Sequence, residues 1–182
     1  MSERELAGSP IWVNDFTEAS AKTFAKEVLE ASADEDKPII VYIDSYGGQV
    51  YALATMVAAL GTVSNKVITV CVGKAMSCGA ILLSCGEERY IDIDSTVMIH
   101  EVSGGFRGNV KDIEVEATEM RRLNDRWMTR LAQNCGKSLE ELEALFRDKR
   151  EIYMTAPDAI EFGLVDKIGI PKLYKVTSYE LA

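Results

Sequence analysis

Short apolar runs alternate along the chain with longer segments in which apolar side chains recur every three or four positions. The runs 39–43, 67–72 and 96–99 are nearly free of charge. Such runs are typical of strands in a parallel sheet that is covered on both faces. Segments such as 16–30 and 50–61 have the spacing of amphipathic helices. The pattern therefore predicts an α/β fold built of right-handed strand–helix–strand units.

Capping residues and helical spacing predict where the helices lie. Asp15 with Glu18 three residues later has the form of a capping box, which predicts a helix start. A long helix is expected over residues 110–134, with the large side chain of Trp127 buried. Further strands are expected at 11–13, 89–91 and 164–168, and a short strand with a polar tail at 173–182. Further helices are expected at 139–149 and from the Thr155 cap to Gly163. The first helix is expected to face the core with Ala21, Phe24, Ala25, Val28 and Leu29.

Length and charge limit the classes of protein to which the chain can belong. Its 182 residues are expected to form one domain, 1–182, in which residues 1–10 are a mobile arm. The net charge of -9 and the pI of about 4.7 argue against nucleic acid or an anionic membrane as a partner. No run reaches transmembrane length and no signal peptide is recognisable, which predicts a cytoplasmic protein.

The sequence gives no reason to expect a cofactor. The chain contains neither a G-x-G-x-x-G nor a G-x-x-x-x-G-K-[ST] motif, so no bound nucleotide is expected. The cysteines lack the spacing of metal ligands, and most lie in apolar segments where they are expected to pack as small hydrophobic residues. They are Cys71, Cys78, Cys85 and Cys135.

One serine lies where a strand is expected to turn directly into a buried helix. The run 67–72 leads into Gly73-Lys74-Ala75-Met76-Ser77, and an apolar helix over 80–86 follows. Such a junction exposes the Ser77 hydroxyl and points the N–H groups of a helix N-terminus at the same place. Acyl-transfer enzymes need this pairing of nucleophile and oxyanion donor. Taken alone, a serine in this position is more often a simple helix cap.

Two further features supply the groups that such a nucleophile requires. His100 is the only histidine of the chain and follows the apolar strand 96–99. Histidine is the usual general base near neutral pH. The pair Gly47-Gly48 follows the strand 39–43, and glycines allow backbone N–H groups to approach a ligand closely. Together these features predict a nucleophile, a base and a second oxyanion donor.

These motifs, taken in order, resemble those of the Clp protease proteolytic subunit family, the ClpP-like serine peptidases of the ClpP/crotonase superfamily. The resemblance runs from about Ile39 to about Ile168. The fold that it implies is a crotonase-like spiral of βαβ units with a protruding long handle helix over 110–134. Its anchors are the turn 45–48, the segment 75–80, Met98-Ile99-His100, Thr155-Ala156-Pro157-Asp158-Ala159 and Gly163-Leu164-Val165-Asp166.

The resemblance implies a serine endopeptidase that cleaves peptides or unfolded polypeptides inside an oligomeric ring chamber. It implies a homo-oligomeric ring or stacked rings, joined through the handle helix and the loop 104–108, and makes an AAA+ unfoldase a candidate partner. The residues that it implies are Ser77 as the nucleophile, His100 as the base, the N–H groups of Gly48 and Cys78 as the oxyanion hole, and Gly104 and Gly105 in the substrate groove.

The catalytic acid is ambiguous at the level of sequence. The family has an aspartate shortly before an aromatic residue, an apolar residue and Thr/Ser-Ala. This register falls on Glu151, because Tyr153-Met154-Thr155-Ala156 follows it. Asp148 has the family's residue type but lies three residues earlier. Register favours Glu151 and residue type favours Asp148, and a third interpretation leaves both acids solvated.

Two other departures from the family pattern affect the expected activity. Tyr46 stands where the family has a proline in the turn, so a fixed backbone angle is lost. The family's N-terminal pore segment is not recognisable, which predicts cleavage of short peptides without ATP.

Other functions fit parts of the same pattern. A crotonase-like acyl-CoA enzyme would use the oxyanion hole but would not need Ser77 or His100. An inactive structural subunit of a mixed ring is expected to have lost one of those residues, whereas both are present. A Ser–Lys peptidase that used Lys74 would be expected to carry a membrane anchor, and the sequence shows none.

Overall fold

A seven-stranded sheet forms the centre of the molecule in the computed structural model, which describes residues 3–6, 10–147, 150–171 and 174–177. Its strand order is β2-β3-β4-β5-β8, with β6 paired to β4 and β7 paired to β6. All of these pairings are parallel except β6 with β7. The strands are β2 (Ile11–Val13), β3 (Ile39–Ser45), β4 (Val67–Met76), β5 (Glu88–Ile91), β6 (Thr96–His100), β7 (Glu151–Met154) and β8 (Lys167–Ile168).

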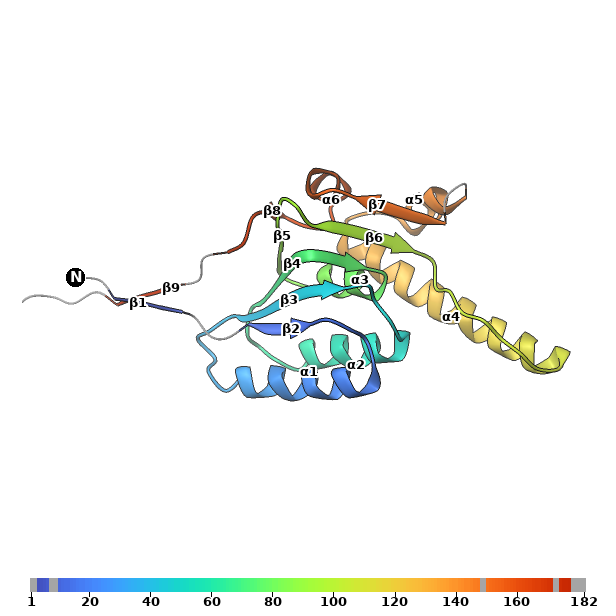
Figure 1. Cartoon of the computed structure of the whole chain (residues 1–182), viewed down its shortest axis with the longest axis horizontal. Helices are drawn as coiled ribbons and strands as arrows, with labels where there is room; N and C mark the ends of the chain where they lie inside the picture. Colours follow the sequence, from blue (N-terminus) through green and yellow to red (C-terminus); the bar gives the residue numbers. More distant parts are fainter. Residues whose placement is uncertain (1–2, 7–9, 148–149, 172–173, 178–182) are drawn as a thin grey trace, which may run out of the picture.

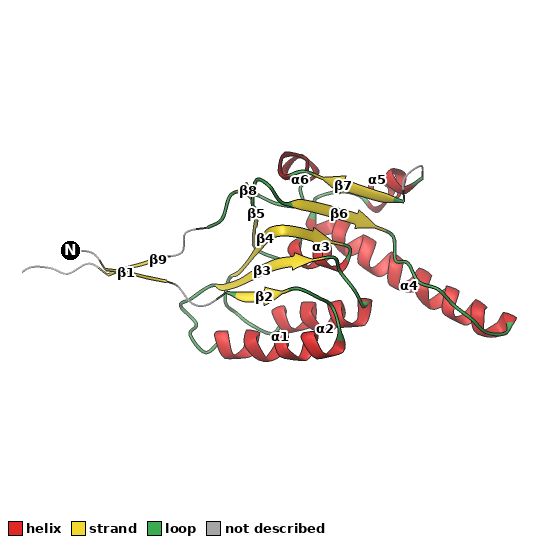
Figure 2. Ribbon diagram, in the orientation of Figure 1, coloured by secondary structure: helices red, strands yellow, loops and turns green. Residues whose placement is uncertain are grey.

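Helices connect the parallel strands, as the α/β prediction requires. Figure 1 shows α1 and α2 side by side against the sheet, while α4 extends well beyond the rest of the domain. In Figure 2, the helices (red) lie outside the strands of the sheet (yellow). The predicted α/β class with a parallel sheet is confirmed. The helices are α1 (Glu18–Ala31), α2 (Val50–Leu60), α3 (Cys78–Leu83), α4 (Val110–Asn134), α5 (Leu139–Phe146) and α6 (Ala156–Phe162).

Strand β4 divides the sheet into two branches. Its first half, Ile68 to Cys71, pairs with β5, whereas Lys74 to Met76 pairs with β6. Both partners lie on the edge of β4 that faces away from β3. The division follows the turn 92–95, where Ser95 is buried and its Oγ accepts the N–H of Gly73 at 2.7 Å. As a result, the end of β6 lies beside the end of β4.

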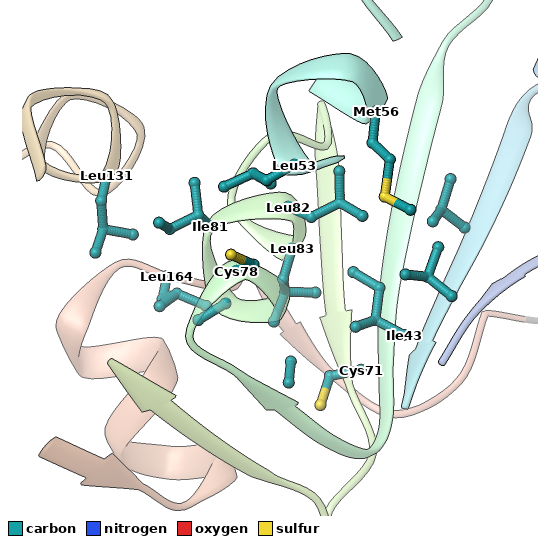
Figure 3. Packing of buried hydrophobic residues seen from close by; sticks show 14 of the residues in the cluster. Ile43, Leu53, Met56, Cys71, Cys78, Ile81, Leu82, Leu83, Leu131 and Leu164 are labelled. Atoms are coloured by element: carbon teal, nitrogen blue, oxygen red, sulfur yellow. The ribbon is translucent and has the colours of Figure 1, made fainter. Parts of the chain in front are cut away.

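The hydrophobic core fills the space between the sheet and the helices. Figure 3 shows Ile43 and Cys71 from the strands packed with Leu53 of α2 and Leu82 of α3. Helix α3 is buried along its whole length, which explains why its sequence is apolar on every face. The short helix is therefore held on all sides, and the serine that precedes it is fixed in place.

Helix α4 has two different halves. Leu123, Trp127 and Leu131 in its C-terminal half are buried in the core, and Trp127 is only 2% exposed, so its predicted burial is confirmed. In the N-terminal half, Val110 and Val115 are about two-thirds exposed or more. The structure therefore places one half of the helix in the domain and leaves the apolar side chains of the other half uncovered.

The first helix begins later than the sequence predicts. Thr17 is the N-cap and forms a capping box with Ser20, so the predicted box of Asp15 and Glu18 is wrong. The reason is that Phe16 is fully buried and makes a parallel β-bridge to Gly48, which keeps the backbone extended up to that residue. Leu29, expected in the core, is 59% exposed because it lies beyond the stripe formed by Ala21, Phe24 and Val28.

The C-terminal third also differs from the predicted elements. Strand β7 is absent from the sequence prediction, since its four residues are too few to show a clear strand pattern. The predicted strand 164–168 is reduced to Lys167–Ile168, because the chain first turns out of α6 at Gly163. Helix α5 ends at Phe146 rather than near residue 149, which lies outside the described residues.

Part of the expected mobile arm forms a strand. Residues 3–6 (β1, Glu3–Leu6) pair in antiparallel fashion with β9 (Tyr174–Thr177), the short strand that the sequence places near the C-terminus. Figure 1 shows this two-stranded ribbon projecting from the domain. Its partners are about 170 residues apart, and a local sequence pattern cannot reveal such a pairing.

Candidate active site

Ser77 lies at the junction of β4 and α3 with a strained backbone. Its φ of 53° and ψ of -119° are unusual, and Ser77 is the only non-glycine residue with positive φ among the described residues. Such a conformation costs about 1–3 kcal/mol and persists only where the surroundings impose it. Here the Ser77 N–H donates to the carbonyl of Met98 at 2.8 Å, and α3 begins at the very next residue. The helix starts before the predicted 80–86, directly at Cys78.

Parallel pairing brings the histidine to the serine. Met76 pairs with Met98, so the two strands end side by side and His100 lies next to Ser77. The distance from His100 Nε2 to Ser77 Oγ is 2.7 Å, which is a short hydrogen bond. Both side chains are partly buried, so a substrate can still reach the serine. This contact is the one that a nucleophile and its general base require.

The double-glycine turn packs directly against Ser77. A Cβ placed on Gly47 would lie 2.7 Å from Ser77 Cβ, and φ of Gly47 is +99°. Gly48 has φ of +151°, and a Cβ there would lie 2.7 Å from the Phe16 carbonyl oxygen. Both positions therefore require glycine. The glycine pair that the sequence predicts as an oxyanion donor therefore lies beside Ser77.

A hydrogen bond from a thiol joins Cys78 to Gly48, the two residues whose N–H groups are expected to form the oxyanion hole. Cys78 Sγ donates to the Gly48 carbonyl at 3.3 Å. Burial raises the pKa of the Cys78 thiol to about 11, so the group stays protonated and can donate at neutral pH. Cys78 is also the first residue of α3, where backbone N–H groups lack acceptors inside the helix. Its N–H is therefore available to a ligand beside Ser77.

Four of the predicted site residues, Gly48, Ser77, Cys78 and His100, line one small pocket of about 60 Å³. Its polar part contains Ser77, His100 and the backbone of Gly48 and Cys78. Its apolar wall comes from three helices and from the loop that follows β6. The sequence did not indicate this wall, because these residues have the pattern of ordinary core positions. The apolar lining residues are Val50, Leu53, Ile81, Val102, Trp127 and Met128.

A wider groove of about 290 Å³ continues from this pocket. The two share Val50, Val102 and Ser103. Gly104, predicted to contact substrate, lies in the groove wall, whereas Gly105 is not among the lining residues and has open space around it. An extended chain held at Ser77 therefore has apolar surface available on one side.

Only one of the two candidate acids lies within the described residues. Glu151 pairs with His100 directly across the antiparallel β6·β7 ladder, so the two side chains are on the same face. Its Oε2 accepts a hydrogen bond from the Tyr153 hydroxyl at 3.1 Å. In the part of the chain that the structure describes, the only side-chain hydrogen bond of His100 is to Ser77. Asp148 lies outside the described residues.

The alternative base Lys74 is engaged elsewhere. Its Nζ donates to Asp44 Oδ1 at 2.5 Å, and the residue in contact with Ser77 Oγ is His100. Within the described ranges, no group of three His, Cys, Asp or Glu side chains could hold a metal ion. Over the same ranges, no helix has the length and apolar character to cross a bilayer.

The fold and the site define an α/β protein with a hydroxyl–imidazole pair at the end of a parallel sheet. A family model described as Clp protease matches residues 11–172, which is most of the chain. The chain belongs to the Clp protease family, and the resemblance predicted from its motifs is confirmed. Members of this family are peptidases that form oligomeric rings and work with AAA+ unfoldases.

Proposed function

We propose that the chain is a serine endopeptidase that cleaves peptides or unfolded polypeptides. The observation that carries this proposal is the contact of 2.7 Å between His100 Nε2 and Ser77 Oγ, made beside the double-glycine turn. Membership of a peptidase family supports the same reaction class. The apolar pocket beside Ser77 suits an apolar side chain of the residue whose carbonyl is attacked.

The chemistry proceeds through an acyl-enzyme. Ser77 Oγ attacks the peptide carbonyl while His100 Nε2 takes its proton, and the N–H groups of Gly48 and Cys78 stabilise the oxyanion. His100 then gives the proton to the leaving amine as the peptide bond breaks. Water, deprotonated by His100, attacks the acyl-enzyme; as the ester bond breaks, His100 returns that proton to Ser77 Oγ and the carboxylic acid product is released. Glu151 is the proposed partner of the imidazolium, since its strand position faces His100.

Assembly into a ring is part of the proposal. Other members of the family form rings, and the uncovered apolar side chains on the N-terminal half of α4 support an interface with a second copy. A ring would enclose Ser77 in a chamber that folded proteins cannot enter. An AAA+ unfoldase is then the expected source of unfolded chains, as for other members.

Labelling with a fluorophosphonate serine probe tests the chemistry. Wild type should be labelled at Ser77, and Ser77→Ala should lose both labelling and peptide turnover by several orders of magnitude, as in other serine triads. Ser84→Ala is a matched control, because Ser84 is buried and its hydroxyl donates to the Ile81 carbonyl at 2.7 Å. Turnover that survives Ser77→Ala would instead favour an enzyme that uses only the oxyanion hole, such as an acyl-CoA enzyme.

A further inference from the structure

Strand β4 carries a bulge beside the double-glycine turn. Ile43 of β3 pairs with Cys71, but Ser45 pairs with Ala75, so two positions along β3 correspond to four along β4. Gly73, inside the bulge, has φ of +83°, and a Cβ there would lie 3.0 Å from Asp44 Oδ1. The bulge therefore redirects the next side chain, that of Lys74, toward Asp44.

Lys74 contacts the chain on both sides of Ser45. Its Nζ donates to Asp44 Oδ1 at 2.5 Å and lies 4.4 Å from the centroid of the Tyr46 ring. The Lys74 side chain is only 23% exposed, although it carries a charge. The hydrogen bond with Asp44 raises the pKa of Lys74 above its ordinary value, so the ammonium group persists at neutral pH.

These contacts fix the residues that lead into the turn. Tyr46 is 75% exposed, so burial does not hold its ring, and a cation–π contact is what orders it. Ser45 between the two contacts is fully buried, and its Oγ accepts the N–H of Gly47 at 3.1 Å. Gly47 in turn packs on Ser77. A connected path thus runs from the Lys74 ammonium to the backbone beside the nucleophile.

We propose that Lys74 is a positioning residue for the reaction, which holds the turn 45–48 against Ser77 through Asp44 and Tyr46 and so fixes the Gly48 N–H as an oxyanion donor. This inference rests on the proposed peptidase function. Two consecutive glycines with positive φ are intrinsically mobile, and an oxyanion donor acts only when it is aligned before the transition state forms. Lys74 supplies the alignment without touching the substrate.

The effect should appear in the transition state rather than in substrate binding. Lys74→Met and Tyr46→Ala should each lower kcat by about tenfold, less than the 10²- to 10³-fold expected when an oxyanion donor is removed outright. KM should stay within about twofold. A peptide boronate, which forms a tetrahedral adduct on Ser77, should bind more weakly by the same factor as the loss in kcat. Tyr46→Phe keeps the ring and should retain wild-type turnover.

Active-site titration separates this inference from the proposed function. Lys74→Met should react with the fluorophosphonate to the same stoichiometry as wild type, which shows an intact Ser77. Lys66→Met is the matched control, because it removes a lysine–glutamate pair with Glu88 at the opposite end of β4 and should leave kcat unchanged. Unchanged kcat in both Lys74→Met and Tyr46→Ala would overturn the inference, as would a loss fully explained by fewer titratable sites. If Ser77→Ala stayed active, the proposed function itself would fail.

Discussion

The backbone of Gly47 leaves no room for a side chain next to Ser77. A methyl group there would meet Ser77 Cβ at 2.7 Å and the Met76 carbonyl oxygen at 2.9 Å, and the positive φ adds strain. We predict that Gly47→Ala lowers kcat at least 10²-fold, as misplacement of catalytic groups by about 1 Å does. Peptide turnover measures this loss. Gly136→Ala is a control, because Gly136 also has positive φ but has open space around it, and it should change stability without changing kcat.

Glu151 lies opposite His100 across the β6·β7 ladder, and its carboxylate accepts a hydrogen bond from the Tyr153 hydroxyl. We predict that Glu151→Gln lowers kcat by several orders of magnitude, as the loss of a triad acid does, whereas Asp148→Asn has little effect. The reason is that residue 151 faces His100 across the ladder and one of its two oxygens is held by the Tyr153 hydroxyl. Tyr153→Phe releases that oxygen and should cause a smaller loss. A damaging Asp148→Asn with a silent Glu151→Gln would reverse the assignment of the acid.

The sequence alone identified Ser77 and His100 as candidate site residues, but it did not predict the structure that surrounds them. Ser77 and His100 follow apolar runs, and strand ends in a parallel sheet meet at one edge, so their proximity could be predicted. The strain at Ser77 depends on the pairing of β4 with β6, which no local pattern contains. The hydrogen bond from Tyr153 to Glu151 was not predicted either, because it depends on strand β7, which is too short to recognise from its sequence.

Among the structural elements, the C-terminal ends of two helices, α4 and α6, meet at one arginine. Arg89 of β5 binds both carboxylate oxygens of Asp166, and its NH1 donates to the carbonyls of Asn134 and Gly163 at the ends of α4 and α6. Helix C-terminal carbonyls lack partners within the helix, so the guanidinium satisfies groups that would otherwise remain unpaired. We predict that Arg89→Met lowers the free energy of unfolding by about 2 kcal/mol. Thermal or urea unfolding measures the change.

The ion pair of Arg89 with Asp166 predicts that the stability of the protein depends on pH. Its hydrogen bonds with Arg89 hold the pKa of Asp166 below its ordinary value, so the carboxylate contributes stability at pH values above the unfolded pKa of about 3.9. That contribution is lost as the pH falls through the folded pKa. The difference in stability between wild type and Arg89→Met should therefore shrink below about pH 4. The difference in stability between wild type and Asp166→Asn should shrink over the same pH range. A difference that stays constant down to pH 3 would contradict this explanation.

Regular elements with strong periodicity were predictable, and short ones were not. The bounds of α4, and the Thr155 cap and Gly163 end of α6, match the prediction because capping residues and a long apolar stripe specify them locally. The start of α1 did not match, since the buried Phe16 and its bridge to Gly48 override the local capping signal. Strands β1 and β7, and the short extent of β8, depend on partners distant in the sequence, so only the folded chain reveals them.

At the scale of the whole molecule, α4 is the helix whose apolar side chains a single copy of the chain leaves exposed to water. Its N-terminal half and the preceding loop expose large apolar side chains among charged residues, and Figure 1 shows this part extending away from the domain. Burying such residues against a second copy would remove apolar area from water. The exposed residues are Phe106, Val110, Ile113 and Val115.

We therefore predict that the 20.1 kDa chain assembles into a ring or stacked rings through this half of α4. Light scattering at micromolar concentration should give a mass that is a multiple of the chain mass. Val110→Lys with Val115→Lys should shift that mass toward smaller species, because each charge would have to be buried at the interface. Leu29→Lys is a matched control, because Leu29 is also an exposed apolar side chain but belongs to a different helix, α1. A wild-type protein that stays monomeric under these conditions would contradict the chamber model, while the chemistry at Ser77 would still be testable with short peptides.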